Sequence, residues 1–269
     1  MGKRFLWLLF TLLLCASLQA QMRFCSWNLC DMGKSKSGAT ITFMAQTLKN
    51  YDLIALQEVV AGPEGAKAVA KLVDALNRTG AKWEYAISLP TSGTRQKRER
   101  YAFLWKKSKV AMKGKPWLDA HFADEIEREP FFGTFTYEKN DFTIVNFHAI
   151  TKKLQPETEI KFFKFYPEKY KDLNLIFAGD FNCAQSHTVF NPIRKMGFQP
   201  VLVDAKTTMR QKCKGDDCLA SEFDNIFYKT TRAKTQESGV VNFYLSFSSL
   251  HEARKISDHL PIWTLLTFD

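Results

Sequence analysis

The chain has 269 residues, a formal net charge of +10 and a hydrophobic fraction of 45%, with 23 phenylalanines. This length is enough for one large domain or two small ones, and the hydrophobic content is that of a globular protein rather than a disordered chain. The positive charge suggests an anionic partner such as nucleic acid, a phosphorylated substrate or a membrane surface, although many proteins without such a partner carry it too.

The first 20 residues have the layout of a secretory signal peptide. Lys3 and Arg4 precede an apolar run over residues 5–14, and small and polar residues follow up to Ala20. We expect cleavage after Ala20 and a secreted or periplasmic protein. The apolar run is too short for an uncleaved membrane anchor, and a lipoprotein signal would need a smaller residue before Cys15. No other segment resembles a transmembrane helix, so we expect no membrane insertion.

Strand-like and helix-like patterns alternate over the rest of the chain, with no repeat, low-complexity tract or linker to divide it. Apolar runs predict strands at residues 22–28, 51–59, 83–89, 101–107, 131–139, 142–150, 173–180, 224–230, 241–247 and 261–268. Apolar residues at helical spacing predict helices at residues 39–50, 65–80 and 156–170. Early βαβ spacing mixed with hairpins indicates a single α/β domain over residues 21–269, with helices packed on mixed sheets.

Cysteine usage agrees with export. Removal of residues 1–20 leaves a net charge of +8 and five cysteines. Because exported proteins can form disulfides, Cys213 and Cys218, which bracket a KGDD segment, are the first choice for a pair. The odd count leaves at least one thiol free or in an intermolecular bond. The cysteines lack paired CxxC spacing, which argues against a zinc site.

Polar residues stand at the ends of several predicted strands. The segment IFAGDFNC ends a buried strand with Asp180 and Asn182, and alternation along an extended chain would put both side chains on one face. A turn or a helix N-cap is the more ordinary reason for such a pair. Asn28, Glu58 and His148 end three other strands in the same way.

Asp224 precedes another strand, and Asp258 and His259 precede the last one. Each of these residues alone could be a surface acid, a hydrogen-bonded structural histidine or a cap. Together they offer oxygen ligands for a hard cation, neutral amides for a phosphate, and two histidines with carboxylates to orient them.

The segments SWN, LQEV, RERYAFLW, NFHAI, GDFN, FDNIFY and SDHLPI occur in the order found in the endonuclease/exonuclease/phosphatase superfamily. The chain resembles this superfamily over almost all of residues 21–269, and RERYAFLW and the REP segment at residues 128–130 are most similar to its deoxyribonuclease I branch. The resemblance implies a four-layer α/β sandwich, in which two mixed β-sheets pack face to face with helices outside. It also implies an Mg²⁺-dependent phosphodiesterase, with Mn²⁺ or Ca²⁺ as supporting ions.

The resemblance assigns catalytic roles to two histidines. His148, paired with Glu99, would stabilise the phosphate and help to protonate the leaving oxygen. His259, oriented by Asp224, would be the general base toward water. Phosphodiester hydrolysis needs both proton transfers, and two histidines with opposite proton duties need different partners.

The resemblance also implies a metal site and a phosphate site. Glu58 would bind Mg²⁺, with Asn28 close by and Asp258 beside the metal. The residues implied to orient the scissile phosphate, the attacking water or the metal, or to contact a substrate phosphate, are Asp180, Asn182 and Arg128.

Four positions depart from the deoxyribonuclease I pattern. Val60 stands where that branch has an arginine that enters the DNA minor groove, and Lys97 stands where a tyrosine stacks against the sugar. Cys30 and Asn225 replace two further arginines. Much of the set of residues that holds the DNA duplex in that branch is therefore absent. The resemblance implies the reaction more strongly than it implies the substrate.

Two basic segments have open interpretations. TSGTRQKRER, at residues 91–100, could follow substrate phosphates, with Arg98 as a candidate phosphate ligand, or could simply face water as charge runs usually do. The segment at residues 161–171 interleaves lysines with aromatic residues, and it could touch nucleic acid or membrane. A helix that packs its aromatic face on the core is the simpler interpretation.

The leading hypothesis is an exported, monomeric, Mg²⁺-dependent endonuclease that cuts DNA without strong sequence preference. An alternative within the superfamily is a phosphodiesterase acting on lipid head groups or small phosphoesters, although no membrane-inserting apolar loop is evident. A third hypothesis is a non-catalytic binding module, but the presence of Glu58 and His259 argues against it, because binding alone would need neither residue. A nuclease subunit of a multi-component toxin would share the same site.

Overall fold

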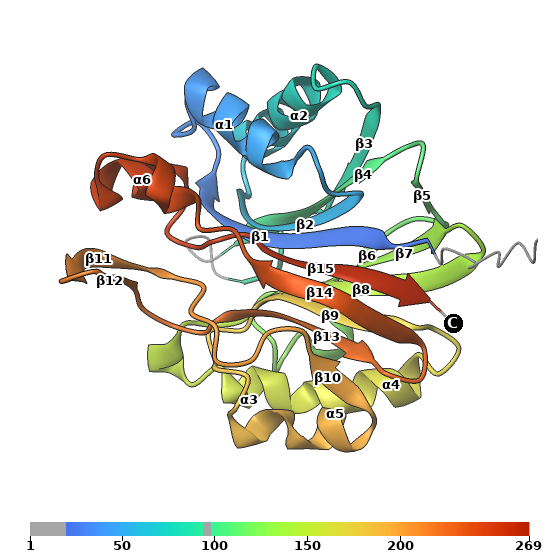
Figure 1. Cartoon of the computed structure of the whole chain (residues 1–269). Helices are drawn as coiled ribbons and strands as arrows, with labels where there is room; N and C mark the ends of the chain where they lie inside the picture. Colours follow the sequence, from blue (N-terminus) through green and yellow to red (C-terminus); the bar gives the residue numbers. More distant parts are fainter. Residues whose placement is uncertain (1–19, 94–97, 269) are drawn as a thin grey trace, which may run out of the picture.

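The structure is a computed structural model, and it describes residues 20–93 and 98–268. The expected signal peptide, apart from Ala20, lies outside the described residues, as do Arg95 and Lys97 of the basic segment. Figure 1 shows two β-sheets stacked in the middle of the molecule, with one group of helices above them and another below. The α/β sandwich with helices outside is confirmed.

Two mixed sheets form the inner layers. The first has the order β14 (Ala233–Val240), β15 (Ile262–Phe268), β1 (Met22–Met32), β2 (Leu53–Val60), β4 (Glu99–Lys106), β3 (Trp83–Ile87). The second has the order β10 (Phe198–Pro200), β13 (Asp224–Lys229), β9 (Leu175–Asp180), β8 (Asn140–His148), β7 (Phe131–Tyr137), β5 (Val110–Met112), and β6 (Trp117–Leu118) also pairs with β7. The β1–β2 and β8–β9 pairs are parallel, and the other pairs in both sheets are antiparallel.

The outer layers are helical. The α-helices are α1 (Gly38–Leu48), α2 (Pro63–Asn77), α3 (Glu157–Ile160), α4 (Tyr166–Lys169), α5 (Asn191–Lys195) and α6 (Leu250–Ile256). Short 3₁₀ turns are η1 (Ala120–Phe122), η2 (Lys152–Leu154), η3 (Lys161–Phe165), η4 (Thr188–Phe190) and η5 (Phe243–Ser246). A small separate hairpin, β11 (Met209–Lys214) with β12 (Asp217–Leu219), projects beyond the sheets at the same end as α6 (Figure 1).

Three apolar clusters hold the four layers together, and strand alternation explains how one strand serves two of them. On β1, Phe24 points into the cluster between the sheets, while Cys25 and Trp27 point into the cluster under α1 and α2. A third cluster lies between the second sheet and the segment from α3 to α5, where Phe163 and Tyr166 are fully buried. The aromatic residues of the 161–171 segment therefore pack mainly on the core.

Several elements differ from the sequence prediction. Residues 241–247 do not form a strand: Phe243–Ser246 is the 3₁₀ turn η5, in which Phe243 packs against Trp27 and Phe43. The helix expected over residues 156–170 is broken into α3, η3 and α4, and Pro167 stands at the start of the last piece. Strand β14 was missed because it is a partly exposed edge strand of mostly polar residues.

Two other predictions from the sequence are settled. The EKND turn is confirmed as the hairpin between β7 and β8, with Glu138 at a φ of 54°. The Cys213–Cys218 disulfide is also present. Within the described residues, no helix is long and apolar enough to cross a membrane.

Candidate active site

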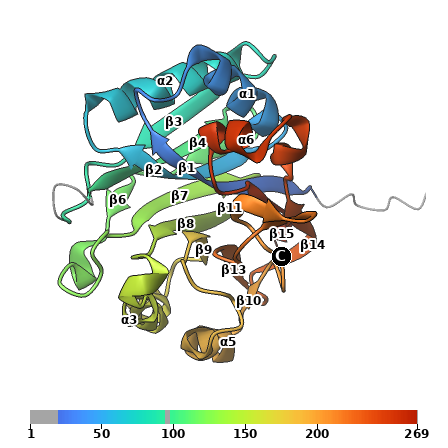
Figure 2. The same ribbon diagram turned by 90° about the vertical axis from the view of Figure 1, so that its left-hand side faces the viewer.

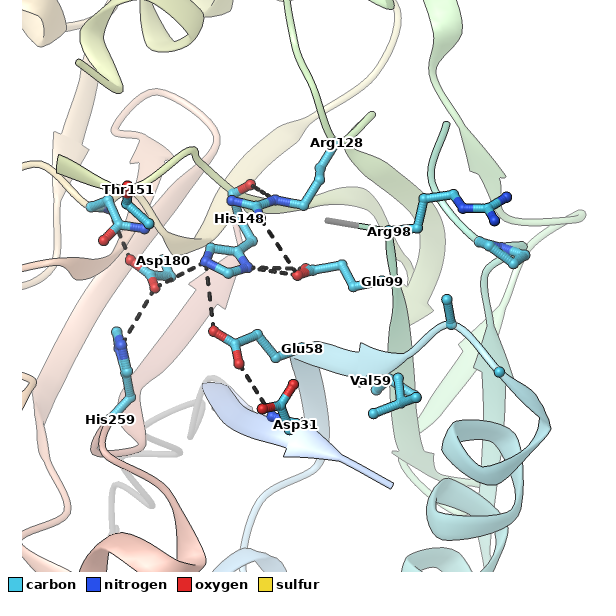
Figure 3. Close-up of a pocket in the computed structure, with 15 residues that line it drawn as sticks. Asp31, Glu58, Val59, Arg98, Glu99, Arg128, His148, Thr151, Asp180 and His259 are labelled. Atoms are coloured by element: carbon cyan, nitrogen blue, oxygen red, sulfur yellow. Dashed lines mark hydrogen bonds and ion pairs between the residues drawn. The ribbon is translucent and has the colours of Figure 1, made fainter. Parts of the chain in front are cut away.

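The polar strand ends meet at one edge of the sandwich, where the two sheets lie against each other. They line a cavity of about 730 Å³ that contains Glu58, Glu99, His148, Asp180 and His259. Figure 3 shows these side chains pointing toward one another from both sheets. Asn182 and Arg128 also line this cavity. Side chains far apart in sequence thus share one site because β2, β8 and β9 end there and β4 begins there.

Irregular backbone on β1 and β2 turns Glu58 into the cavity. The β1–β2 pairing shifts register between Asn28 and Met32, and the β2–β4 pairing shifts between Leu56 and Val59. Glu58 itself has a φ of 55°, a left-handed conformation that is uncommon for a residue with a side chain. Such bulges re-aim side chains at sheet edges, often beside active sites.

A tight turn places Asp180 and Asn182. Strand β9 ends at Asp180, and Asn182 has a φ of 49°, so strand alternation is not what brings the two side chains together. Instead, the Asn182 backbone N–H donates to Asp180 Oδ1 at 2.8 Å. Gly179 precedes them with a φ of 142°, and a Cβ there would lie 1.9 Å from the Phe147 carbonyl oxygen, so this close approach of β8 and β9 requires glycine.

His148 is held by Glu99 and by its own backbone contacts. Its Nδ1 lies 3.0 and 2.9 Å from the two Glu99 carboxylate oxygens, and its N–H donates to the Tyr101 hydroxyl at 3.2 Å. Arg128 lies beneath this pair: its Nε donates to the His148 carbonyl at 2.9 Å, and its Nη2 donates to the Ala149 carbonyl. Because Arg128 is buried and occupied in this way, the structure gives it a part in positioning His148 in addition to its place in the cavity wall.

His259 is held by Asp224, which a threonine holds in turn. His259 Nδ1 lies 2.9 Å from Asp224 Oδ2, and the Thr207 hydroxyl donates to the same oxygen at 2.6 Å. The Asp224 N–H donates back to the Thr207 hydroxyl at 3.0 Å. Asp224 Oδ1 is buried without a hydrogen-bond partner in the described part of the chain, so the carboxylate is held through Oδ2.

Asp180 lies between the two histidines. Its Oδ2 is 3.4 Å from His148 Nε2 and 3.5 Å from His259 Nε2, and it accepts a hydrogen bond of 3.0 Å from the Asn28 side-chain amide. The same amide donates to Glu58 Oε1 at 2.9 Å. Asn28 therefore bridges the buried Asp180 carboxylate and the partly exposed Glu58 carboxylate through its nitrogen, while its oxygen accepts the Cys30 N–H.

The surroundings of the two histidines shift their proton affinities in opposite directions. Burial, with help from the Arg128 cation, lowers the pKa of His148 to about 4. Burial also acts to lower the pKa of His259, but the Asp224 and Asp180 carboxylates outweigh it and raise that pKa well above the usual value. These groups by themselves leave His148 neutral and His259 protonated. A general base at His259 therefore requires that the negative charge beside it be offset in the working enzyme.

The donor atoms beside His148 fit a hard divalent cation. Asp31 and Glu58 each bring a carboxylate oxygen to a group of three atoms that lie within 4.8 Å of one another, and the third atom, the Cys30 sulfur, is a soft ligand that does not suit such an ion. Burial raises the pKa of Glu58, so its carboxylate lacks charge compensation that a cation would supply. Carboxylate oxygens are preferred ligands for such ions. A second group with the same spacing is Asp180, Asp224 and His259.

Two predicted residues lie at the margin of the site. Asp258 forms an ion pair of 3.1 Å with Arg254 and lines a neighbouring groove instead of the main cavity. Arg98 lines the main cavity but is exposed, and Figure 3 shows it at the edge farthest from His259. Their assignments as a metal ligand and a phosphate ligand stay predictions.

Comparison with known proteins settles the family. Residues 25–259 match the model of the Endonuclease/Exonuclease/phosphatase family. The chain belongs to this family. It is 28% identical over 278 residues to a deoxyribonuclease of Thioalkalivibrio sp. (strain K90mix), covering 96% of this chain and 74% of that protein. It is 30% identical over 284 residues to human deoxyribonuclease gamma, covering 94% of this chain and 88% of that protein.

A similar solved structure confirms the fold but has a different activity in its name. The Bacteroides thetaiotaomicron mannosyl-6-phosphatase Bt3783 superposes with a TM-score of 0.66 at 18% identity, covering 92% of this chain and all of that chain. The endonuclease/exonuclease/phosphatase fold therefore carries more than one hydrolytic activity, and the substrate has to be argued from the site.

Within this family site, sequence reasoning missed three contributors. Asp31 lies beside Glu58, and its backbone N–H donates to Glu58 Oε2 at 3.1 Å. Tyr101 and Thr207 contact the backbone of His148 and the side chain of Asp224. Asp31 and Thr207 stand in no quoted motif, and Tyr101 lies in RERYAFLW without a polar strand-end position to mark it; each acts through a contact between distant segments. Two of the positions that depart from the deoxyribonuclease I pattern can be located in the structure. Val60 lines the cavity, and Asn225 is buried and hydrogen-bonded to the Leu202 backbone.

Proposed function

We propose that the protein is an exported endonuclease that hydrolyses DNA phosphodiester bonds and depends on Mg²⁺. The observation that supports it most is the pair of histidines, each with its own carboxylate partner, facing each other across Asp180. This arrangement suits a reaction in which one proton is removed from water and another is given to a leaving oxygen. The two relatives described as deoxyribonucleases point to DNA as the substrate.

The proposed roles follow from the contacts. Glu58, with Asp31 beside it, would hold the cation, which would neutralise charge on the phosphate oxygens. Asp180 and Asn182 would orient the phosphate and the attacking water. His259, aligned by Asp224, would take the proton from water once the bound cation offsets the neighbouring negative charge.

His148 would donate a hydrogen bond to the phosphate or the leaving oxygen. Its Nδ1 faces Glu99 at 2.9 to 3.0 Å, which turns Nε2 toward the cavity. Burial raises the pKa of Glu99 to about 7, so this carboxyl can hold a proton near neutral pH and exchange it with His148. Arg128 would keep both groups in place and add positive charge beneath the phosphate.

Export is the second part of the proposal, together with a single domain over residues 21–269 that works as a monomer. The N-terminal pattern of Lys3 and Arg4 before an apolar run supports it, and so does the Cys213–Cys218 disulfide, which forms in oxidising compartments. N-terminal sequencing of protein recovered from the periplasm or the medium would test it. If the protein were found only inside the cell, with its N-terminus still at Met1, the result would contradict export.

A second candidate is a phosphodiesterase for lipid head groups or small phosphoesters. Two observations support this candidate: the fold is similar to that of a mannosyl-6-phosphatase, and Val60 stands where the deoxyribonuclease I branch has an arginine. One assay panel separates the candidates: supercoiled plasmid, single-stranded DNA, RNA, sphingomyelin and a chromogenic phosphodiester, each with Mg²⁺ and with chelator. Cleavage of lipid but not plasmid would overturn the nuclease proposal.

The same panel tests the assigned histidines. We expect His148→Ala and His259→Ala to lower kcat by roughly two to four decades, as removal of an acid–base group usually does. Far-ultraviolet circular dichroism and a melting curve should show that both variants are folded. A folded His259→Ala protein with near-normal turnover would exclude the role given to His259.

A further inference from the structure

A groove opens beside the active site on the side of His259. Its volume is about 480 Å³, and it shares Asn182 and His259 with the main cavity. Its outer wall is the β11–β12 hairpin, which supplies Arg210, Lys212 and Lys214. Figure 2 looks onto this end of the molecule and shows β11 beside α6, in front of the sheets. A long substrate that leaves the active site on this side has to pass along the hairpin.

The base of the hairpin is bonded to the loop that carries His259. The Met209 N–H donates to the Asp258 carbonyl at 2.8 Å, and Thr208 forms an antiparallel bridge with His259. Arg254 spans the two segments: Nη1 donates to the Met209 carbonyl at 2.8 Å, and Nη2 lies 3.1 Å from Asp258 Oδ2. The position of the hairpin is therefore set relative to the catalytic histidine.

The hairpin is also cross-linked internally. A two-stranded hairpin on its own is marginally stable in water. Here the Cys213–Cys218 disulfide joins its strands, and Asp217 forms ion pairs with Lys206 at 3.0 Å and with Arg210 at 2.8 Å. An arm that is ordered in advance loses less conformational entropy when it binds a ligand.

The charge in the groove that is left without a partner is positive. Arg210 and Arg254 are paired with carboxylates. Lys212 and Lys214 are exposed, and neither has a carboxylate partner within residues 20–93 and 98–268. Two lysine ammonium groups on a rigid arm, next to the proposed position of the scissile phosphate, match a chain of further phosphates.

We propose that the groove between the β11–β12 hairpin and His259 is a binding subsite for the nucleic-acid strand that flanks the scissile phosphate, with Lys212 and Lys214 contacting its phosphates. This inference rests on the proposed function. Contacts of this kind carry no base information, so the subsite adds affinity and register without sequence preference. The subsite would supply contacts to the strand in a protein that has Val60 in place of the expected arginine.

The test compares Lys212→Ala/Lys214→Ala with a control that removes the same charge elsewhere. Lys109→Ala/Lys139→Ala is suitable because both lysines are exposed: Lys109 follows the end of β4 that is opposite Glu99, and Lys139 precedes the end of β8 that is opposite His148. Binding of a fluorescein-labelled DNA duplex to the mature, disulfide-bonded protein is measured by anisotropy in chelator over a range of salt concentrations. Plasmid cleavage with Mg²⁺ is measured in parallel.

Each lysine–phosphate contact contributes about 0.9 to the slope of log affinity against log salt. We therefore expect the slope to fall by about 2 in the hairpin variant. Equivalently, the affinity ratio of wild type to variant should shrink roughly tenfold between about 50 and 200 mM salt. The control should keep the wild-type slope. Lys212→Gln/Lys214→Gln, which keeps most of the side-chain length, should match the alanine variant if charge is the cause.

The outcomes separate this inference from the proposed function. A wild-type protein that cleaves plasmid, combined with an unchanged salt slope in both hairpin variants, overturns the subsite and leaves the nuclease standing. A wild-type protein that neither binds nor cleaves DNA removes the proposed function, and the subsite with it. Loss of binding to phosphatidylserine vesicles in the hairpin variants, without any change in DNA binding, would assign the arm to a membrane surface instead and overturn the proposal.

Discussion

Replacing Thr207 with valine removes the hydroxyl that holds Asp224 beside His259, and nearly nothing else. Thr207 is fully buried, and its hydroxyl donates to Asp224 Oδ2 and accepts the Asp224 and Phe223 N–H groups. A hydrogen bond to a charged group is worth about 1.5–3 kcal/mol, and buried N–H groups left without an acceptor add to the loss. We expect the free energy of unfolding to fall by about 2–4 kcal/mol.

Turnover should fall as well, because Asp224 would then be held by His259 alone. Loss of a partner that orients a catalytic or metal-binding group commonly costs about ten- to a hundredfold. Without the threonine hydrogen bond, the negative charge of Asp224 is shared with no other donor and acts on His259 alone, so the pKa of His259 should rise and the ascending limb of the pH–rate profile should move to higher pH. A purely structural role would lower stability without moving that limb.

Thr207→Ser is the matched control, since it keeps the hydroxyl and removes one methyl group, at a cost of about 0.8 kcal/mol. Both variants would be compared by urea unfolding and by steady-state kinetics on the chromogenic diester across pH, at a temperature where both are folded. If the valine and serine variants have the same kcat and the same pH profile, the reasoning from Asp224 Oδ2 is refuted.

The remaining predictions concern the other half of the site. Arg128 Nη1 lies 3.9 Å from Glu99 Oε2, so Arg128→Ala removes the cation beside this buried carboxylate and should lower the free energy of unfolding by roughly 3–5 kcal/mol in urea titrations. A loss below 1 kcal/mol would contradict this reasoning. Burial raises the pKa of Glu99 to about 7, so the Glu99 carboxyl makes the free energy of unfolding fall as pH rises toward 7. Burial lowers the pKa of His148 to about 4, so the His148 ring makes the free energy of unfolding rise from about pH 4 up to the pKa of an unfolded histidine. In chelator, Glu99→Gln should remove the first contribution, so that its stability gains on wild type by about 3 kcal/mol between pH 4.5 and 7; a constant difference would argue against the shift. Glu58→Gln should raise the Mg²⁺ concentration needed for half-maximal activity at least tenfold, and an unchanged metal titration would remove Glu58 from the metal site.

The layers of the fold could be predicted because alternation along a strand is a local property. Met22 and Phe24 face one cluster and Cys25 and Trp27 the other, so the apolar pattern of β1 already indicates a strand buried on both sides. The same reasoning failed at residues 241–247. There the apolar residues pack on Trp27 and on α1 as a 3₁₀ turn, and a pattern of burial does not reveal which backbone groups find a strand partner.

The meeting of most of these polar residues at one cavity could also be predicted, since motif order marked the ends of the strands. Their geometry could not. Glu58 points into the cavity because its own backbone is left-handed, at a place where the strand register shifts. Thr207 contacts Asp224, which lies 17 positions later in the sequence. Both depend on which strands pair and where the pairing slips, which is decided by tertiary packing and leaves no periodic signal in the chain.

In the IFAGDFNC segment, a turn and a place in the candidate site occur together. Asp180 Oδ1 accepts the Asn182 N–H, which is ordinary turn chemistry. That bond sets the carboxylate orientation and leaves Oδ2 free to face Asn28 at 3.0 Å and the two histidines at 3.4 and 3.5 Å. The turn is therefore the reason that a buried carboxylate can lie midway between His148 and His259. A substitution such as Asp180→Asn would disturb the turn little, because an amide oxygen still accepts the N–H, while removing the charge that both histidines face.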